Sequence, residues 1–288
     1  MAGLKHLKNR LTSIKSTRKI TKAMQLVSAA KLKRIKERAE VLDEYSSALG
    51  DIMYNISLDN NLTELPLEDQ KFFSQTLKDM PHLLIIMTSE RGLCGSFNSN
   101  LLKRAKLEIE KLESLGKIVK LLIIGKKGLD SLKNDFEEKI LGYYHVSHGN
   151  YEQLASKIKN KIIELVETEQ IGACYMYYNK FKNALTQIVT EEQILPAHVS
   201  SDNKVDMEFE YEGMGLVHKV INLYIGGQIN YGLLQNRASE EGARMTAMDN
   251  ATRNAGELIE KLTLQLNRSR QAMITTELTE IISGAESV

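Results

Sequence analysis

The sequence predicts an α/β protein in which the N- and C-terminal helices form a long antiparallel coiled coil and an α/β domain is inserted between them. Three observations support this prediction. All three prolines lie in the middle of the chain, at 66, 81 and 196, which leaves residues 1–65 and 197–288 free of the strongest helix breaker. Apolar residues in the first of these stretches recur at helical spacing. Between the two stretches, short apolar runs alternate with amphipathic segments, as they do in α/β domains.

The N-terminal stretch is expected to form one long helix over residues 1–58. Alternating steps of three and four residues, starting at Leu4, define sixteen positions up to Ile56, and eleven of them are apolar. Such spacing is typical of a coiled-coil seam. The pattern breaks between residues 18 and 28, where the apolar side chains fall on another face: Ile20, Met24 and Val27. We therefore expect a different neighbour to meet the helix at this point.

The middle of the chain has the period of a mainly parallel sheet with covering helices. Apolar runs bounded by turn residues predict strands at 83–88, 118–125, 143–146, 171–178 and 185–191. The last of these is expected to be an edge strand paired in a hairpin. Amphipathic stretches predict helices at 96–115, 126–134 and 151–169. This alternation predicts an α/β domain over 82–205, after a linker at 59–81.

The C-terminal helix is clearest from about residue 238 onward. Its apolar residues follow the same spacing, with one slip near the end: Met248, Ala251, Ala255, Leu258, Leu262, Leu266 and Met273. Five glycines between residues 213 and 232 each cost about 1 kcal/mol of helix stability relative to alanine. We therefore expect the helix to start somewhere within 206–235. Because two long amphipathic helices can bury their seams against each other, 206–288 is predicted to form the second half of the coiled coil.

The charge of the chain is strongly asymmetric. Residues 1–38 carry twelve Lys and Arg and a single acid, a net charge of +11, whereas the remainder carries −10. A basic helix on an acidic body predicts an anionic partner: nucleic acid, lipid headgroups or an acidic protein surface. Composition does not choose among these, although no Phe, Trp or Tyr precedes Tyr45 to stack on nucleic-acid bases. The same stretch imitates an organellar transit peptide, but the seam continues beyond the length of such a peptide.

Composition excludes several classes of protein. No run of 18 apolar residues is present, which excludes a membrane-spanning helix. The two cysteines, Cys94 and Cys174, provide neither a disulfide framework nor a four-ligand zinc site. We therefore expect a reduced protein on the cytosolic side of the membrane.

One turn has the sequence context of an active site, because residues 89–96 follow a predicted strand and open a predicted helix. Cys94 could be a nucleophile there, but a nucleophile elbow would need glycine in place of Ser96. The spacing of Gly92 and Gly95 does not match the dinucleotide-binding fingerprint. A tight strand-to-helix turn that needs both glycines is the simpler interpretation.

The remaining polar clusters predict no chemistry. His145 and His148 are three residues apart but have no Cys, Asp or Glu at ligand spacing, so both are expected in solvated loops. The acid pairs at 137–138 and 240–241 are expected on solvated helix faces. The sequence therefore predicts no catalytic residue, no cofactor and no metal site.

Both ends of the chain carry distinctive motifs. At the N-terminal end these are N-R-L at 9–11, S-T-R-K-I-T-K-A-M at 16–24 and V-S-A-A-K at 27–31. At the C-terminal end they include S-E-E at 239–241, A-R-M at 243–245, N-R at 267–268 and R-Q-A at 270–272. Together with R-G-L-C-G at 91–95, these motifs occur in the same order as in one family. The whole chain resembles the gamma subunit of the F-type, proton-transporting ATP synthase, bacterial type.

The resemblance implies a central-stalk rotor that couples proton translocation to ATP synthesis or hydrolysis. In this family the paired helices sit inside a ring of alternating alpha and beta subunits. A Rossmann-like α/β domain sits with the epsilon subunit on the membrane-embedded c-subunit ring. The implied protein is a non-catalytic subunit at the cytoplasmic face of the bacterial inner membrane. It would associate with the membrane through the c ring only, and it would bind no nucleic acid.

The resemblance also implies roles for individual residues. Arg244 and Gln271 match family positions that hydrogen-bond to beta-subunit loops, and Met24 matches a position near the same contact on the facing helix. The shaft tip in the bearing would contain Ile274, Leu278 and Ile281.

Other interpretations stay open at this point. One is a coiled-coil scaffold or nucleic-acid-binding protein with a basic N-terminal helix, and another is an enzyme that depends on Cys94. The chain lacks the cysteine pair of chloroplast relatives, and its first helix is expected to begin almost at Met1. A bacterial form without a presequence is therefore expected.

Overall fold

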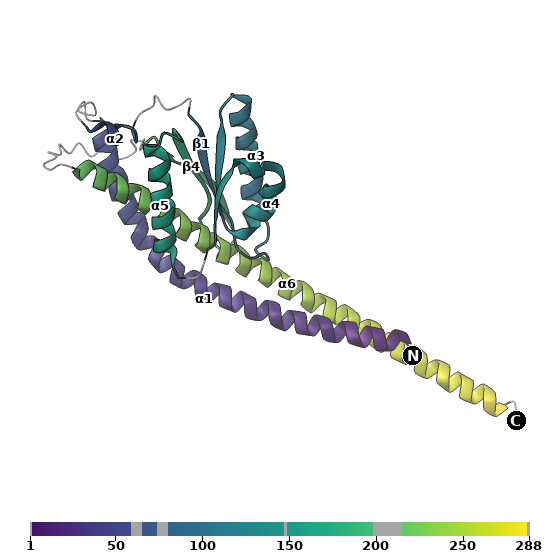
Figure 1. Ribbon diagram of the computed structural model, residues 1–288. Helices are drawn as coiled ribbons and strands as arrows, with labels where there is room; N and C mark the ends of the chain where they lie inside the picture. Colours follow the sequence, from purple (N-terminus) through teal and green to yellow (C-terminus); the bar gives the residue numbers. More distant parts are fainter. Residues whose placement is uncertain (1, 59–64, 74–79, 147–148, 198–214, 287–288) are drawn as a thin grey trace. The chain divides into compact units, whose positions relative to one another are not determined.

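A computed structural model describes residues 2–58, 65–73, 80–146, 149–197 and 215–286 (Figure 1). The chain divides into two compact units. The two-helix unit comprises Met1–Ala29 and Arg244–Val288, and the α/β unit comprises Ala30–Ala243. Helix α1 (Ala2–Leu58) and helix α6 (Leu216–Glu286) each contribute to both units. Since residues 198–214 lie outside the described part, the expected start of the last helix is tested only from residue 215 onward.

The α/β unit contains a five-stranded sheet with the order β3-β2-β1-β4-β5. Its strands are β1 (His82–Met87), β2 (Val119–Ile124), β3 (Ile140–Tyr144), β4 (Ala173–Phe181) and β5 (Gln187–Leu195). The first four strands pair in parallel, and β5 pairs with β4 in an antiparallel hairpin at the edge of the sheet. The predicted α/β class, with its edge hairpin, is confirmed.

Helices cover both faces of this sheet (Figure 1). One face is covered by α3 (Phe97–Ser114) and α4 (Lys126–Phe136), which continues into a 3-10 turn at Glu137–Lys139. The other is covered by α5 (Tyr151–Glu167) and by the parts of α1 and α6 that belong to this unit. A short helix, α2 (Leu67–Gln70), lies before β1 in the chain.

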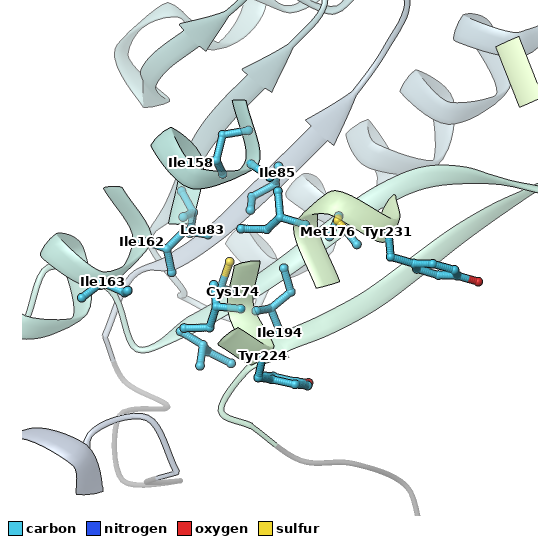
Figure 2. Packing of buried hydrophobic residues seen from close by; sticks show 14 of the residues in the cluster. Leu83, Ile85, Ile158, Ile162, Ile163, Cys174, Met176, Ile194, Tyr224 and Tyr231 are labelled. Carbon is cyan, nitrogen blue, oxygen red and sulfur yellow. The ribbon is translucent and has the colours of Figure 1, made fainter. Parts of the chain in front are cut away.

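The central strand explains why the sheet needs two layers of helices. All six residues of β1 are buried, which is the pattern of a parallel strand covered on both faces. Successive side chains of a strand point to opposite faces. Accordingly, Leu83 and Ile85 join the core beneath α5, while Leu84 and Ile86 join the core beneath α3. Figure 2 shows the first of these cores, with Ile158 and Ile162 of α5 against the sheet and Tyr224 and Tyr231 of α6 nearby.

In the two-helix unit, α1 and α6 pack as an antiparallel pair whose seam is partly polar. The Thr21 and Thr252 hydroxyls are 2.8 Å apart, and the Gln25 amide donates to the Asp249 carboxylate at 2.8 Å. Thr21 is buried although it lies where the apolar pattern of α1 breaks. The α1–α6 contact therefore continues through this segment with hydrogen-bonding residues in place of apolar ones, and the expectation that a different neighbour meets the other face of α1 between residues 18 and 28 stays a prediction.

The apolar residues of that segment point outward instead. Ile20 and Val27 are exposed by 60% and 54%, and Met24 is partly buried. On α6 the seam also differs from the expected one in two places. Thr252 bonds across the seam beside the expected Ala251, which is partly buried as well, and Ile259 is partly buried where the expected Leu258 is exposed. The corrected positions 248, 252, 255, 259, 262, 266, 269 and 273 alternate by four and three, and all are buried or partly buried.

Candidate functional site

The place where parallel α/β sheets usually bind ligands is filled by this chain itself. Such sites lie beyond the carboxyl ends of the strands, at the point where the strand order reverses. Here that point lies between β1 and β4. The backbone N–H groups of Asn179 and Phe181, at the end of β4, donate to the side-chain oxygens of Asn236 and Gln235 on α6, at 3.0 and 3.2 Å. Helix α6 thus occupies the position of a ligand.

The turn at 89–96 is held by its own side chains. The Asn98 amide donates to Ser89 Oγ at 2.7 Å and to Cys94 Sγ at 3.4 Å, and the Ser89 backbone N–H donates to Asn98 Oδ1 at 3.0 Å. Cys94 is buried, with Phe97 and Ala243 in one apolar cluster. Packing against Phe97 and Ala243 explains why the Cys94 thiol is buried, and no catalytic role is needed to explain it. These contacts favour the structural interpretation of the turn.

The backbone conformation of this turn favours glycine at only one of its two glycine positions. Gly95 has a φ of 60°, in the left-handed region that favours glycine, and so does the non-glycine Leu93 with a φ of 65°. Gly92 has open space around it and is not among the residues with positive φ. The expectation that both glycines are needed is therefore wrong for Gly92.

The predicted histidine pair is only partly described. His145 Nδ1 lies 2.9 Å from the carboxylate of Glu90, which also accepts the backbone N–H of Val146 at 2.7 Å. His148 lies outside the described residues. Within the ranges that the structure covers, no group of three or more His, Cys, Asp or Glu side chains could hold a metal ion. The contact of His145 with Glu90 stabilises the loop after β3.

The two acid pairs behave differently. Glu137 and Glu138 are exposed, as expected. Glu240 and Glu241 are buried, so the expectation of a solvated helix face is wrong for them. Both carboxylates contact the Arg237 guanidinium at 2.6 Å.

The hydrogen bonds across the seam set the register between α1 and α6 in the two-helix unit. Thr21 lies opposite Thr252, and Gln25 lies opposite Asp249. The same register places Arg244 level with Ala29, which is about 8 Å along the axis from Met24 at 1.5 Å per residue. Arg244 itself is largely buried, with 8% of its surface exposed.

Gln271 lies far from the other two candidate contact residues. It is exposed, and it is separated from Arg244 by about 40 Å along α6. The register places it level with the first residues of α1. The structure therefore places Met24 and Arg244 at nearby levels along the helix pair and Gln271 at the other end of the paired segment.

Beyond Gln271, α6 continues without α1 beside it (Figure 1). Ile274, Leu278 and Ile281 are exposed by 49%, 54% and 68%. The threonines between them bond within the helix: the hydroxyls of Thr275, Thr276 and Thr279 donate to the carbonyls four residues earlier at 2.8–3.0 Å. The tip thus exposes apolar side chains and uses its hydroxyl donors internally.

The basic N-terminal segment forms one wall of a groove in the two-helix unit. Five cationic side chains and one carboxylate line it, together with Ala23, Leu26, Thr252 and Ile259: Lys15, Arg18, Lys19, Lys22, Arg253 and Asp249. The groove has a volume of about 800 Å³. It gives the predicted anionic partner a surface to contact.

Comparisons with known proteins decide among the open interpretations. The ATP synthase family model matches residues 3–288. The ATP synthase gamma chain of Rickettsia felis is 51% identical over 290 residues, which cover 100% of both chains. The chain belongs to the ATP synthase gamma-chain family. The Tetrahymena thermophila mitochondrial ATP synthase structure described as central stalk/c-ring contains a chain that is 27% identical, with a TM-score of 0.58 over 81% of this chain and 99% of that one.

A further solved structure supports the fold. A chain of the Euglena gracilis mitochondrial ATP synthase matches with a TM-score of 0.68 and 19% identity, over 99% of this chain and 94% of that one. Family membership confirms the function predicted from the terminal motifs, a gamma subunit of F-type ATP synthase. It gives no support to a nucleic-acid-binding scaffold. A gamma chain is a non-catalytic stalk subunit. Within the described residues, no helix is both long enough and apolar enough to span a bilayer.

Sequence reasoning missed two features that distinguish this chain from a plain apolar coiled coil. One is the buried charge cluster around Arg237, in which Glu240 and Glu241 were expected to be solvated. The other is the polar seam, whose signal was that Thr21, Gln25 and Ser28 fall on the heptad positions where apolar residues stop.

Proposed function

We propose that this chain turns inside a ring of alternating alpha and beta subunits, driven by a c-subunit ring on which the α/β unit sits with the epsilon subunit. The observation that carries this proposal is the C-terminal end of α6. It extends beyond the start of α1 as a helix with exposed apolar side chains, which suits insertion into a sleeve formed by other subunits. The related chain in the central stalk and c-ring of the Tetrahymena thermophila mitochondrial ATP synthase supports the same arrangement.

The tip has the properties that a bearing needs. Ile274, Leu278 and Ile281 supply apolar contact, which is non-directional and therefore tolerates rotation. Hydrogen bonds to the sleeve would be directional and would favour one angle. Because the threonine hydroxyls donate within the helix, they are not the donors of such bonds. We therefore assign these three apolar residues to the rotating contact.

Arg244, Gln271 and Met24 are proposed to contact beta-subunit loops. Their placement implies two separate contacts, one near Met24 and Arg244 and one near Gln271, since about 40 Å of helix separates Arg244 from Gln271. Met24 lies on α1 beside the polar part of the seam but on another face, and its level along the axis is about 8 Å from that of Arg244. The family resemblance implies that the beta-subunit loops facing the shaft are acidic, so a positive charge added at Met24 would strengthen attraction to them and hinder rotation.

The variant Met24→Lys tests that contact. We expect it to keep ATP hydrolysis while ATP-driven proton pumping falls, because an extra ionic contact resists rotation under load. Both activities are measured in the same reconstituted vesicles. Undiminished pumping by the variant would refute the assignment of Met24.

We propose that the chain has no active site of its own. The crevice at the switch point of the sheet is filled by α6, and Cys94 is engaged by the turn that it belongs to. We divide the chain for experiments into an N-terminal helix (1–58), a linker (59–81), an α/β domain (82–205) and a C-terminal helix (206–288). The complex would lie at the cytoplasmic face of the bacterial inner membrane, with this chain contacting the membrane through the c ring alone.

Reconstitution tests the function as a whole. The chain is mixed with alpha and beta subunits of an F-type enzyme, the complex is isolated by size exclusion, and ATP hydrolysis is measured. We expect one copy of this chain per three beta subunits and an activity that depends on it. A well-folded chain that does not assemble would overturn the proposal, and salt-sensitive binding of the chain to DNA would then be the next measurement.

A further inference from the structure

A cluster of four charged residues lies where α1 and α6 enter the α/β unit. Arg237, Glu240 and Glu241 are on α6, and Lys31 is on α1. Between residues 231 and 243, every residue of α6 except Gln235 is buried. The α/β unit contains α1 from residue 30 and α6 up to residue 243. Lys31 therefore lies at the start of the α1 segment in this unit, and Glu240 and Glu241 lie at the end of its α6 segment. We call these four residues the Arg237 network.

The contacts of the network join the two long helices. Arg237 Nη1 and Nη2 lie 2.6 Å from Glu240 Oε2 and Glu241 Oε1. Lys31 Nζ lies 3.8 Å from the same Glu241 oxygen, and its side chain is 44% exposed. Tyr151, the first residue of α5, is beside the network. Burial raises the pKa of its hydroxyl, while the nearby Arg237 guanidinium acts in the opposite direction.

Stability alone does not explain why charges occupy this place. Removing two carboxylates and a guanidinium from water costs several kcal/mol per ion, and apolar residues of similar volume are often as stable or more so. The best-attested benefit of buried polar groups is that they specify one register. The two pairs with Arg237 are within α6, whereas the Lys31 contact links α6 to α1.

The network opposes rotation of α6 about its own axis. Apolar packing is non-directional, so an apolar interface alone permits small rotations at little cost. A rotation by one residue would be about 100° and would carry Glu241 away from Lys31. The ion pair between the two helices would then be lost, although Arg237, which turns with α6, would stay beside the carboxylate. Because α1 and α6 both continue from the two-helix unit into the α/β unit, torque between the units passes through the turns that contain Lys31, Glu240 and Glu241.

We propose that the Arg237 network is the positioning element that keeps α6 in rotational register with α1, so that torque passes between the α/β unit and the helix pair without slippage. This inference rests on the proposed rotor function. It assigns to Lys31 and Glu241 a role in coupling rather than in folding.

The first test removes the contact between the helices with little risk to folding. Lys31→Gln leaves Arg237 to balance the two carboxylates, because Arg237 contacts both. In reconstituted vesicles we expect ATP hydrolysis within twofold of the wild type and proton pumping per ATP at least twofold lower against a preformed gradient. Lys31→Arg should restore pumping. The matched control is Lys157→Gln, which removes one lysine charge from an exposed position on α5.

A second variant replaces the charges inside α6. Arg237→Met with Glu240→Gln and Glu241→Gln removes all three charges at similar volume, so the fold is expected to persist. We expect at least a fivefold loss of pumping per ATP with an unchanged thermal midpoint. Wild-type pumping by a folded triple variant and by Lys31→Gln would overturn the proposal. If the triple variant does not fold, Lys31→Gln and its rescue by Lys31→Arg decide.

The same preparations separate this inference from the rotor function. Failure of the wild-type chain to assemble, or to support hydrolysis, would count against the rotor itself. A wild-type chain that assembles and pumps, next to variants that pump equally well, would refute the Arg237 network alone.

Discussion

Among the glycines that the structure describes in the α/β unit, Gly125 is the one whose substitution by alanine should cost the most. It has a φ of 92° and begins α4 directly after β2. A Cβ there would lie 2.2 Å from the backbone oxygen of Thr88 and 2.8 Å from its Oγ1. That hydroxyl oxygen accepts the Gly128 N–H at 2.7 Å. Backbone strain of about 1–3 kcal/mol and overpacking of about 1–3 kcal/mol, with disturbance of this buried bond, predict a loss of about 3–6 kcal/mol for Gly125→Ala.

A denaturant titration followed by tyrosine fluorescence measures the unfolding of the α/β unit, which contains Gly125. All 11 tyrosines lie between residues 45 and 231, inside the α/β unit, and the chain has no tryptophan. Two control variants separate the causes. Gly116 has a φ of 74° with open space around it, so Gly116→Ala should lose only about 1–2 kcal/mol of backbone strain. Gly92→Ala should change the free energy of unfolding by less than about 0.5 kcal/mol. A loss at Gly125 no larger than that at Gly116 would refute the clash with Thr88.

Three further predictions follow from single contacts. Gln25→Ala removes the 2.8 Å bond to Asp249 and should destabilise the two-helix unit by about 1–2 kcal/mol. Far-UV circular dichroism should then show loss of helix at a lower denaturant concentration. An unchanged transition would mean that the seam bond contributes nothing to stability. Burial raises the pKa of Glu192 above its ordinary 4.5, so its contribution to stability is present below that pH and is lost as the pH rises through the raised value. Glu192→Gln keeps an acceptor for the Tyr178 hydroxyl. Denaturant titrations followed by tyrosine fluorescence should show this variant to be more stable than the wild type at pH 7 but not at pH 4. A variant as stable as the wild type at both pH values would contradict this. Thr276→Val should leave ATP hydrolysis of the assembled complex within twofold, because the lost hydroxyl bonds within α6; a tenfold loss would reveal a bond to another subunit.

Most of the fold could be predicted because local signals agree with the tertiary structure. The strand β1 is a continuous apolar run that both sheet faces require, and α5 has the spacing of a helix covering one face. Proline placement also sufficed to predict two long helices. The errors arose where polar residues occupy buried positions. Hydrophobic periodicity cannot detect Thr21 or Gln25 in a seam, since their burial depends on hydrogen-bonding partners more than 200 residues away.

The candidate site was predictable only in part, for a related reason. The terminal motifs identify the family, but they do not show which members of a motif face outward. Glu240 and Glu241 have the composition of a solvated face, and their burial follows from Arg237, one turn earlier, and from Lys31 on another helix. A buried charge needs its counter-charge in three dimensions, and a pattern along one helix does not contain that information.

The polar groups along α6 follow a sequence that suits a rotating shaft. At Glu240 and Glu241 they are buried and paired with Arg237 of the same helix, and Glu241 also contacts Lys31 of α1, the contact that we propose keeps the two helices in rotational register. At Asp249 and Thr252 they bond across the seam to α1, which fixes the register of the pair while using less apolar packing. At the tip, where other subunits would surround the helix, Thr275, Thr276 and Thr279 bond only backward along α6. The threonine bonds at the tip thus stay within α6, so the contact that is proposed to slide is left to the apolar side chains.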